Sequence, residues 1–334
     1  MQTAVAAIFV FLLVILLHEL GHFIVAKLVG VKVNEFSIGM GPKLIQKIKG
    51  ETKYTFRLLP IGGYCAMEGE NEDSDDPRSF NNVSPLSRIA VVAAGAIMNF
   101  VLAFIILSIV AFYTGTPSNI VGGFSSNSPA ANSGIMVGDV ITEINGIEIN
   151  SWDMITDTIG NSKPQENIEI IVMRNNESIN IDIKPLLEEG RTIIGITPKY
   201  SRTASSAIKG GIELTWFFVK LLFDFFTGIF RGEFSANDIS GPIGVISVIG
   251  EAANTGFINL LYLLGYISVN LGVFNLLPIP ALDGSRIVFI LIELIRGKPI
   301  NPEKEGFIHM VGFALLITLI LVVTYQDLIR IKLL

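Results

Sequence analysis

The sequence contains four apolar stretches that are each long enough to cross the hydrocarbon core of a membrane, which takes about 20 residues of helix. These stretches cover residues 4–29, 88–113, 258–278 and 307–325. The mean hydropathy of the chain is +0.58, and only 16% of its residues are charged, whereas a soluble domain carries about a quarter. We therefore predict a polytopic α-helical membrane protein with about four transmembrane helices.

Two other features refine this prediction. The first stretch has no basic residue before it and no small-residue cleavage site after it, so we expect a retained helix and not a signal peptide. A fifth apolar stretch, 211–230, carries Glu213, Lys220 and Asp224 on one helical face. We expect this stretch to lie in the membrane interface as an amphipathic helix.

The distribution of lysine and arginine predicts the orientation, because cytoplasmic segments carry an excess of both. Nine such residues lie in or beside 30–87 and three lie in 296–306, whereas the longer segment 114–205 holds only six. We therefore expect a multi-pass protein of the cytoplasmic membrane, with 30–87 and 296–306 in the cytoplasm and 114–205 extracytoplasmic.

Two segments outside the spans favour β-structure. Residues 53–58 alternate weakly in polarity and lead into Pro60-Ile61-Gly62-Gly63-Tyr64, which predicts a membrane-associated β-hairpin or sheet. The segment 118–187 contains several short strand-like runs and an Asn145-Gly146 turn signal, so it predicts an inserted β-rich, α+β domain.

These elements divide the chain into four parts. Residues 1–115 form an N-terminal membrane half, which includes the cytoplasmic-side β region at 30–87. The inserted domain takes residues 116–190, and a linker with the amphipathic helix takes 191–256. Residues 257–334 form the C-terminal membrane half.

The first apolar stretch contains His18, Glu19 and His22. Two imidazoles four residues apart share one face of a helix and can bind one Zn²⁺ ion, and the adjacent glutamate can activate a water molecule. A pair of helix histidines satisfied by local hydrogen bonds would show the same pattern. Ionisable side chains inside a span are costly, however, and usually mark function. The sequence therefore predicts zinc as cofactor, His18 and His22 as metal ligands, and Glu19 as the catalytic base.

A catalytic zinc site needs a third protein ligand. The remaining histidine is His309, at the start of the last span, and the one cysteine is Cys65, in the hairpin region. Asp283 is the better candidate, because it follows a proline-rich break at 275–282 and irregular backbone at membrane depth must be buried or line a cavity. We predict Asp283 as the third ligand, with a helix cap at the membrane surface as the alternative.

Together these motifs resemble the site-two-protease family of zinc intramembrane metalloproteases, and within it the bacterial regulator-of-sigma-E protease type. The resemblance covers nearly the whole chain and rests mainly on H-E-x-x-H at 18–22 and N-x-x-P-x-P-x-L-D-G at 275–284. The inserted domain resembles a bacterial PDZ domain through S-P-A-x-x-S-G-I-x-x-G-D-V-I-x-x-I-N-G at 128–146. In the second span, Gly95-x-x-x-Asn99 matches a family segment, but Ala96 replaces the usual proline, which leaves the role of Asn99 open.

The resemblance implies a zinc metalloendopeptidase that hydrolyses peptide bonds within or near transmembrane segments, as in regulated intramembrane proteolysis. It implies single-pass membrane proteins as substrates, of the anti-sigma factor or remnant signal peptide type, and a role for Asn275 in holding the substrate or the developing oxyanion. The net charge of −6 gives no footprint for nucleic acid. The PDZ domain could capture a freed carboxyl terminus or act as a size filter, and we favour the filter.

The hairpin offers a place for the substrate, because a helical substrate must unwind before its carbonyl groups can be attacked. An unwound segment can pair with a sheet edge as an added strand. We therefore expect Tyr54, Phe56, Gly62 and Gly63 to contribute to substrate binding.

Two other classes of function stay open at this stage. A membrane scaffold could use zinc structurally, although a structural site would be closed by four protein ligands. A transporter could also combine a broken helix with a carboxylate at membrane depth, although the chain shows no internal repeat. Replacing Glu19 by glutamine separates the enzyme from the scaffold, because only the enzyme loses an activity.

Overall fold

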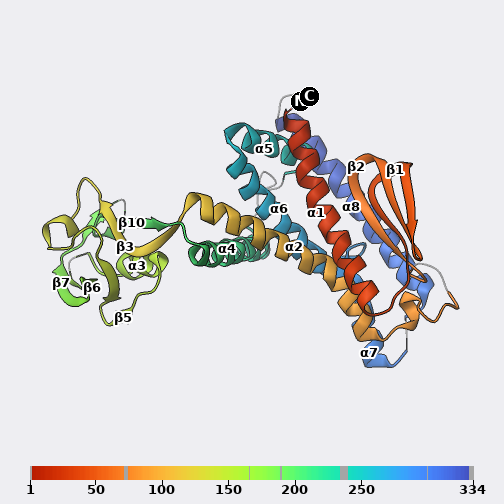
Figure 1. Ribbon diagram of the computed structural model, residues 1–334, viewed down its shortest axis with the longest axis horizontal. Helices are drawn as coiled ribbons and strands as arrows, with labels where there is room; N and C mark the ends of the chain where they lie inside the picture. The colour runs from red at the N-terminus through yellow and green to blue at the C-terminus, as the bar shows by residue number, and fades with distance from the viewer. Residues whose placement is uncertain are drawn as a thin grey trace. The chain divides into compact units, whose positions relative to one another are not determined.

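The computed structural model describes residues 2–70, 74–164, 166–188, 190–233, 240–298 and 300–330 (Figure 1). The chain divides into two compact units. The first unit combines Met1–Leu107 with Gly211–Leu334, and the second is Ser108–Gly210. Residues 234–239, within the linker expected at 191–256, lie outside the described residues.

Among the described residues, four helices are long and apolar enough to cross a membrane. They are α1 (Gln2–Leu28), α2 (Pro85–Thr114), α6 (Phe257–Leu276) and α8 (Pro302–Arg330). In the most apolar window of α8 only 11% of the residues are buried within the protein, so its apolar side chains need lipid around them. The predicted polytopic helical fold is confirmed, and each expected span agrees with its helix to within a few residues.

The shorter helices are α4 (Ala204–Arg231), α5 (Pro242–Thr255) and α7 (Asp283–Arg296). The helix α6 ends at Leu276, and α7 begins at Asp283. Pro278 and Pro280 lie between them, where their missing N–H groups and fixed φ angles prevent a continuous helix. The broken helix predicted before Asp283 is therefore present.

The hairpin consists of β1 (Val33–Lys49) and β2 (Thr52–Met67), which pair in antiparallel fashion. The first part of β1 pairs with two parts of β2, because Phe36 has both Tyr54 and Cys65 as partners. Tyr54 is paired in turn with Lys47 on its other side. Within the described ranges, no strand pairs with the outer side of residues 63–67, which leaves this stretch as a free edge.

A buried apolar cluster joins the hairpin to the helices of the first unit. Its members come from α1, β1, β2, α2 and α7, and include Ala26, Phe36, Met67, Val91 and Ile290. A second cluster joins α2, α4 and α6. Close packing of these side chains holds the elements of the first unit together. The first cluster fixes β2 and α7 beside α1, as the adjoining ribbons in Figure 1 also show for β2.

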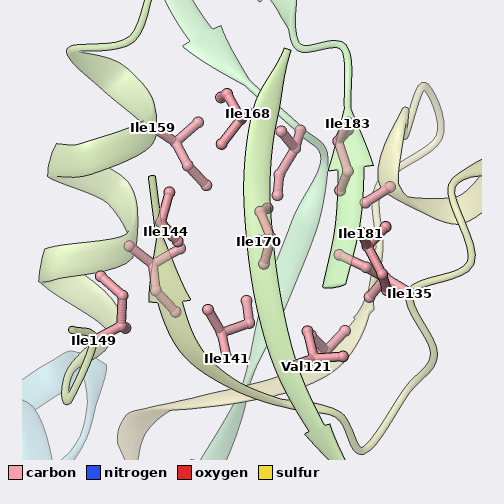
Figure 2. Close-up of a cluster of buried hydrophobic side chains, with 14 residues drawn as sticks. Val121, Ile135, Ile141, Ile144, Ile149, Ile159, Ile168, Ile170, Ile181 and Ile183 are labelled. Atoms are coloured by element: carbon pink, nitrogen blue, oxygen red, sulfur yellow. The ribbon is translucent and has the colours of Figure 1, made fainter. Parts of the chain in front are cut away.

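The second unit is β-rich, as predicted. Its main sheet has the order β10-β3-β4-β6-β7, with β5 paired to β4. The element bounds are β3 (Thr116–Phe124), β4 (Val140–Ile144), β5 (Ile147–Glu148), α3 (Trp152–Gly160), β6 (Ile168–Arg174), β7 (Glu177–Ile183), β8 (Leu186–Glu188), β9 (Arg191–Ile193) and β10 (Ile196–Ser201). Isoleucines from α3, β4, β6 and β7 point toward one another in its core (Figure 2).

Backbone conformation explains one turn of this unit, and strand pairing explains where the unit ends. Asn145 and Gly146 take φ angles of 49° and 79°, which are the positive values that a two-residue hairpin turn requires. The sheet continues beyond residue 190, where we expected the domain to end, because β10 returns to pair with β3. At the base of the sheet Thr116 faces Ser201, so the unit closes on itself.

Candidate metal centre

Three predicted metal ligands meet in the first unit. His18 and His22 lie one turn apart on α1, and their Nε2 atoms are 3.1 Å apart. Oδ2 of Asp283, the first residue of α7, is 3.2 Å from Nε2 of His18 and 3.4 Å from Nε2 of His22. The three ligand atoms therefore form a nearly equilateral triangle.

The size of this triangle fits zinc. Ligands that surround zinc tetrahedrally at about 2.0–2.1 Å are separated from one another by about 3.3–3.4 Å. The measured separations of 3.1, 3.2 and 3.4 Å are close to that value. Oδ2 of Asp283 is buried and has no hydrogen-bond partner among the described residues. The donor set of two imidazoles and one carboxylate leaves the fourth position open, as in catalytic zinc sites.

Contacts on the far side of each imidazole orient the two rings. Nδ1 of His22 lies 2.8 Å from the carbonyl oxygen of Val91, to which it donates, so Nε2 keeps its lone pair for a metal. Nδ1 of His18 lies 3.2 Å from Nδ2 of Asn99, a residue that is fully buried in α2. When Nε2 of His18 binds a metal, Nδ1 carries the proton, and the oxygen of the Asn99 amide is the group that can accept it.

A glycine in α2 leaves room for the two rings. A methyl group at Gly95 would lie 2.7 Å from Cε1 of His18 and 2.6 Å from Cε1 of His22. Gly21 has a similar role on α1, because a side chain there would overlap the backbone carbonyl of Ala94. The two helices can therefore approach closely enough for Asn99 to contact His18.

Glu19 lies beside the metal ligands in a pocket of about 750 Å³. The pocket is lined by residues of α1, β2, α2, α7, α8 and the break before α7: His18, Glu19, His22, Tyr64, Cys65, Ala66, Met67, Glu70, Val92, Ala281, Leu282, Asp283, Arg286, Gly306, His309, Met310 and Phe313. Glu19 shares this pocket with the three proposed metal ligands and with residues 64–67 of β2. The proposed base therefore lies near both the metal ligands and the free edge of β2.

Two ion pairs hold α7, which carries Asp283. Arg88 at the start of α2 is 2.5 Å from the carboxylate of Glu293, and its side chain is almost entirely buried. Arg286 pairs with Glu70, which follows β2. A pair with so little contact with water is hard to separate, because removing one partner leaves the other charge uncompensated. The position of Asp283 is thereby tied to both α2 and the hairpin.

The predicted substrate-binding residues lie at different distances from the metal site. Gly63 lies near Glu19, because a Cβ placed on Gly63 would be 3.6 Å from Cγ of Glu19. Gly62 has a φ of +85° and lies against the side chain of Met40. Asn275 is buried in the last turn of α6 and is not among the residues that line the pocket.

Tyr54 and Phe56 do not lie at a free strand edge, and their part in substrate binding stays a prediction. Each is paired on both sides: Tyr54 with Phe36 and Lys47, and Phe56 with Ile38 and Ile45. The ring of Tyr54 also packs against Phe23 and Phe36. An added strand has no place to pair there. The sequence does not predict this pairing, because the register of a bulged hairpin depends on long-range contacts.

The two less favoured ligands, His309 and Cys65, also line the pocket but lie outside the triangle of ligand atoms. Cys65 is buried in the apolar cluster, and this burial raises the pKa of its thiol, with the nearby Glu19 charge acting in the same direction. A thiol of that kind is a poor metal ligand at neutral pH, because the thiolate is the form that binds. The sequence points to Asn99 and Gly95 only through a match to a family motif. The position of Asn99 inside a span is a further sign of function, because polar residues there usually have a functional role.

Comparisons with known proteins agree with this site. The sequence model of peptidase family M50 matches residues 6–319. A protein of Clostridium acetobutylicum, named as a candidate zinc metalloprotease, is 44% identical over 328 residues, which cover 97% of this chain and 96% of the relative. The regulator of sigma-W protease RasP of Bacillus subtilis is 32% identical over 417 aligned positions, covering 98% of this chain and 99% of the relative. Among solved structures, the PDZ domain of an SdrC-like protein of Listeria monocytogenes covers 25% of this chain and 87% of its own, with 28% identity and a TM-score of 0.22.

Proposed function

This chain belongs to peptidase family M50, and from that membership we propose that its site cleaves peptide bonds within or near the transmembrane segments of other membrane proteins. The chain is a membrane protein and a zinc metalloprotease. The observation that carries the proposal is the triangle of His18, His22 and Asp283 with Glu19 beside it, at a transmembrane helix.

His18, His22 and Asp283 would hold the zinc ion. When bound, zinc supplies Lewis-acid chemistry, which polarises a peptide carbonyl and makes water more acidic. The opposite charges offset each other in this buried place, because Zn²⁺ balances the carboxylates of Asp283 and Glu19. This charge balance explains how the two carboxylates can lie close together among apolar helices.

Glu19 would move the proton. Its carboxylate takes a proton from the attacking water and returns it to the nitrogen of the leaving amine. The side chain lies close to the edge of β2, where a substrate strand would lie, because a Cβ on Gly63 would be 3.6 Å from Cγ of Glu19. Catalysis of this kind contributes about 10²–10⁴-fold to the rate.

The substrate would pair with residues 63–67 of β2. No strand in the described part of the chain pairs with the outer side of this stretch, and four of its residues, Tyr64 to Met67, line the pocket. Backbone pairing would hold the unwound substrate extended beside Glu19. Asn275 stays a prediction as a further substrate contact.

For the substrates, we propose single-pass membrane proteins of the anti-sigma factor or remnant signal peptide type. The name of the Bacillus subtilis relative, a regulator of sigma-W protease, supports the first class. We further propose the cytoplasmic membrane as the location, with the second unit on the extracytoplasmic side. The distribution of lysine and arginine supports this orientation.

The function is tested by purifying the full chain in detergent and measuring zinc content together with cleavage of a model transmembrane peptide. We expect cleavage that a chelator abolishes and added zinc restores. The Glu19→Gln variant should keep its zinc and lose cleavage by at least about 10²-fold. A Glu19→Gln variant that cleaves at the wild-type rate would refute the proposal, and zinc retained without any cleavage by the wild type would favour a scaffold.

A further inference from the structure

The last span, α8, contacts the broken segment just before Asp283. The backbone N–H of Ala281 donates a hydrogen bond to Nδ1 of His309, with a distance of 3.1 Å. Ala281 lies between α6 and α7, where the chain has no regular hydrogen bonding. The imidazole therefore satisfies a backbone donor that is two residues away from the proposed metal ligand.

The conformation of Ala281 shows that this segment is held in place. Its φ angle is +76°, a left-handed value that residues with a Cβ atom rarely adopt. Such a conformation persists only when the surroundings determine it, and it is concentrated at functional sites. The hydrogen bond to His309 is made by the backbone N–H of Ala281, the residue that has this left-handed conformation.

A second contact lies one helical turn further along α8. A methyl group at Gly312 would overlap Cβ of Pro280 and would lie 2.7 Å from the carbonyl oxygen of Pro280. Only glycine lets α8 approach Pro280 this closely. His309 and Gly312 share one face of the helix, so α8 contacts two consecutive residues of the break, Pro280 and Ala281.

The imidazole also reaches the helix that follows the break. The rings of His309 and Phe289, on α7, meet edge to face with centroids 5.5 Å apart. His309 thus contacts both the segment before Asp283 and the helix after it. Because Nδ1 accepts a hydrogen bond, a neutral ring carries its proton on Nε2, which has no hydrogen-bond partner among the described residues.

We propose that His309 is a positioning residue, which holds Ala281 in its left-handed conformation and so places the Asp283 carboxylate on the two imidazoles of α1. This inference rests on the proposed role of Asp283 as a zinc ligand. It assigns His309 a role as a hydrogen-bond acceptor and not as a ligand or a catalytic residue. The last span thereby becomes part of the metal site through its contact with the break.

The test compares substitutions that keep or remove the acceptor at the position of Nδ1. His309→Asn keeps it, because the amide oxygen of asparagine can occupy that position. His309→Phe keeps a ring against Phe289 but cannot accept, and His309→Gln carries its polar atoms one bond further out. Thr318→Ala is the matched control on α8, since the Thr318 hydroxyl donates to the carbonyl of Ala314 in its own helix.

The readout is the zinc dissociation constant of the full chain in detergent, measured by competition with a chelator, together with kcat and KM for a model transmembrane peptide. We expect His309→Phe and His309→Gln to weaken zinc binding about tenfold and to lower kcat while KM changes little. His309→Asn should stay within about threefold of the wild type and Thr318→Ala should match it. If His309→Phe does not fold, the comparison of His309→Gln with His309→Asn still shows whether the acceptor at the position of Nδ1 supports zinc binding.

The inference is overturned if His309→Gln binds zinc as tightly as the wild type, or if asparagine and glutamine weaken binding equally. Asp283→Asn is measured in parallel to separate this failure from a failure of the proposed metal site. Wild-type zinc binding by Asp283→Asn would remove the metal site itself. Loss of zinc by Asp283→Asn with tight binding by every His309 variant would remove only the role of His309.

Discussion

Asn99 shows how a single amide can decide whether a histidine is available to a metal. Its side chain is completely buried and contacts Nδ1 of His18, which must donate a hydrogen when Nε2 binds zinc. The amide can turn its oxygen toward that hydrogen, and the oxygen has no other partner among the described residues. With the amide turned in this way, we expect Asn99 to set the tautomer of His18 from a different helix.

We predict that Asn99→Leu weakens zinc binding about 10–100-fold, because His18 loses the partner that orients its ring. Ser268→Ala is the control, since the hydroxyl of Ser268 donates to the backbone carbonyl of Asn99 at 2.8 Å and does not reach the imidazole. Chelator competition on the two purified variants provides the measurement. Equal losses of affinity in both would show that Asn99 acts through helix packing and not through His18.

The hairpin shows which parts of an element can be read from sequence. Alternating polarity at 53–58 and the Pro60-to-Tyr64 signal predict β-structure, and both segments lie in β2, whereas the turn of the hairpin is at Gly50 and Glu51. The partners of each residue could not be predicted, because Phe36 pairs with both Tyr54 and Cys65 and this depends on how the long strands fold back. Likewise His18, Glu19, His22 and Asp283 carry spacing or proline signals, but His309 and Gly95 act through contacts that only tertiary packing creates.

The free edge of β2 leads to a cross-linking prediction. A photoreactive amino acid at Ala66, on the edge that lines the pocket, should cross-link to a bound transmembrane peptide. The same group at Lys47, on the opposite edge of the sheet beside Tyr54, should not. The products are detected by mass spectrometry in the Glu19→Gln variant. Comparable cross-linking at Lys47 would contradict strand addition beside the metal site.

The second unit contains a partly buried ion pair that makes its stability depend on pH. Two hydrogen bonds of 2.7 Å from the Arg174 guanidinium hold the pKa of the Asp139 carboxyl below its usual value, and the backbone N–H of Met136 acts in the same direction. A carboxyl with a lowered pKa stabilises the fold above its unfolded pKa of about 3.9. This stabilisation is lost as the pH falls through the folded pKa.

We therefore predict that Asp139→Asn destabilises this unit by about 2 kcal/mol at pH 7. The difference from the wild type should shrink as the pH falls below about 4, since the wild-type carboxyl then becomes neutral. The chain has two tryptophans, so urea unfolding can be followed through Trp152 in a Trp216→Phe background. A difference that stays constant between pH 7 and pH 3 would mean that the charge of Asp139 is not the cause.

The chain combines a membrane unit that carries the proposed metal ligands with an inserted unit, predicted to be a PDZ domain, that contributes none of these three residues. The ends of the inserted unit are adjacent, because Thr116 pairs with Ser201 and its hydroxyl donates to the carbonyl of Ser206. The unit can therefore be removed without separating the segments that precede and follow it. A cut at 187 would instead leave β10 without its partner β3.

We predict that replacing residues 117–200 by a short glycine-serine linker allows cleavage of a substrate that still carries its extracytoplasmic domain. This is the result expected of a size filter. The measurement compares cleavage of trimmed and untrimmed versions of one single-pass substrate by the two forms of the chain. Loss of cleavage of the trimmed substrate would instead identify the inserted unit as a capture site for a freed carboxyl terminus.

Whether His18, His22 and Asp283 share one zinc ion can be measured by zinc K-edge X-ray absorption, with metal content, on the purified chain and its Asp283→Asn variant. We predict one zinc ion per chain, bound by two imidazole nitrogens and light oxygen ligands at about 2.0–2.1 Å. In Asp283→Asn we predict a changed coordination shell and weaker retention of the ion. A spectrum without imidazole ligands, or one that Asp283→Asn leaves unchanged, would contradict this assignment.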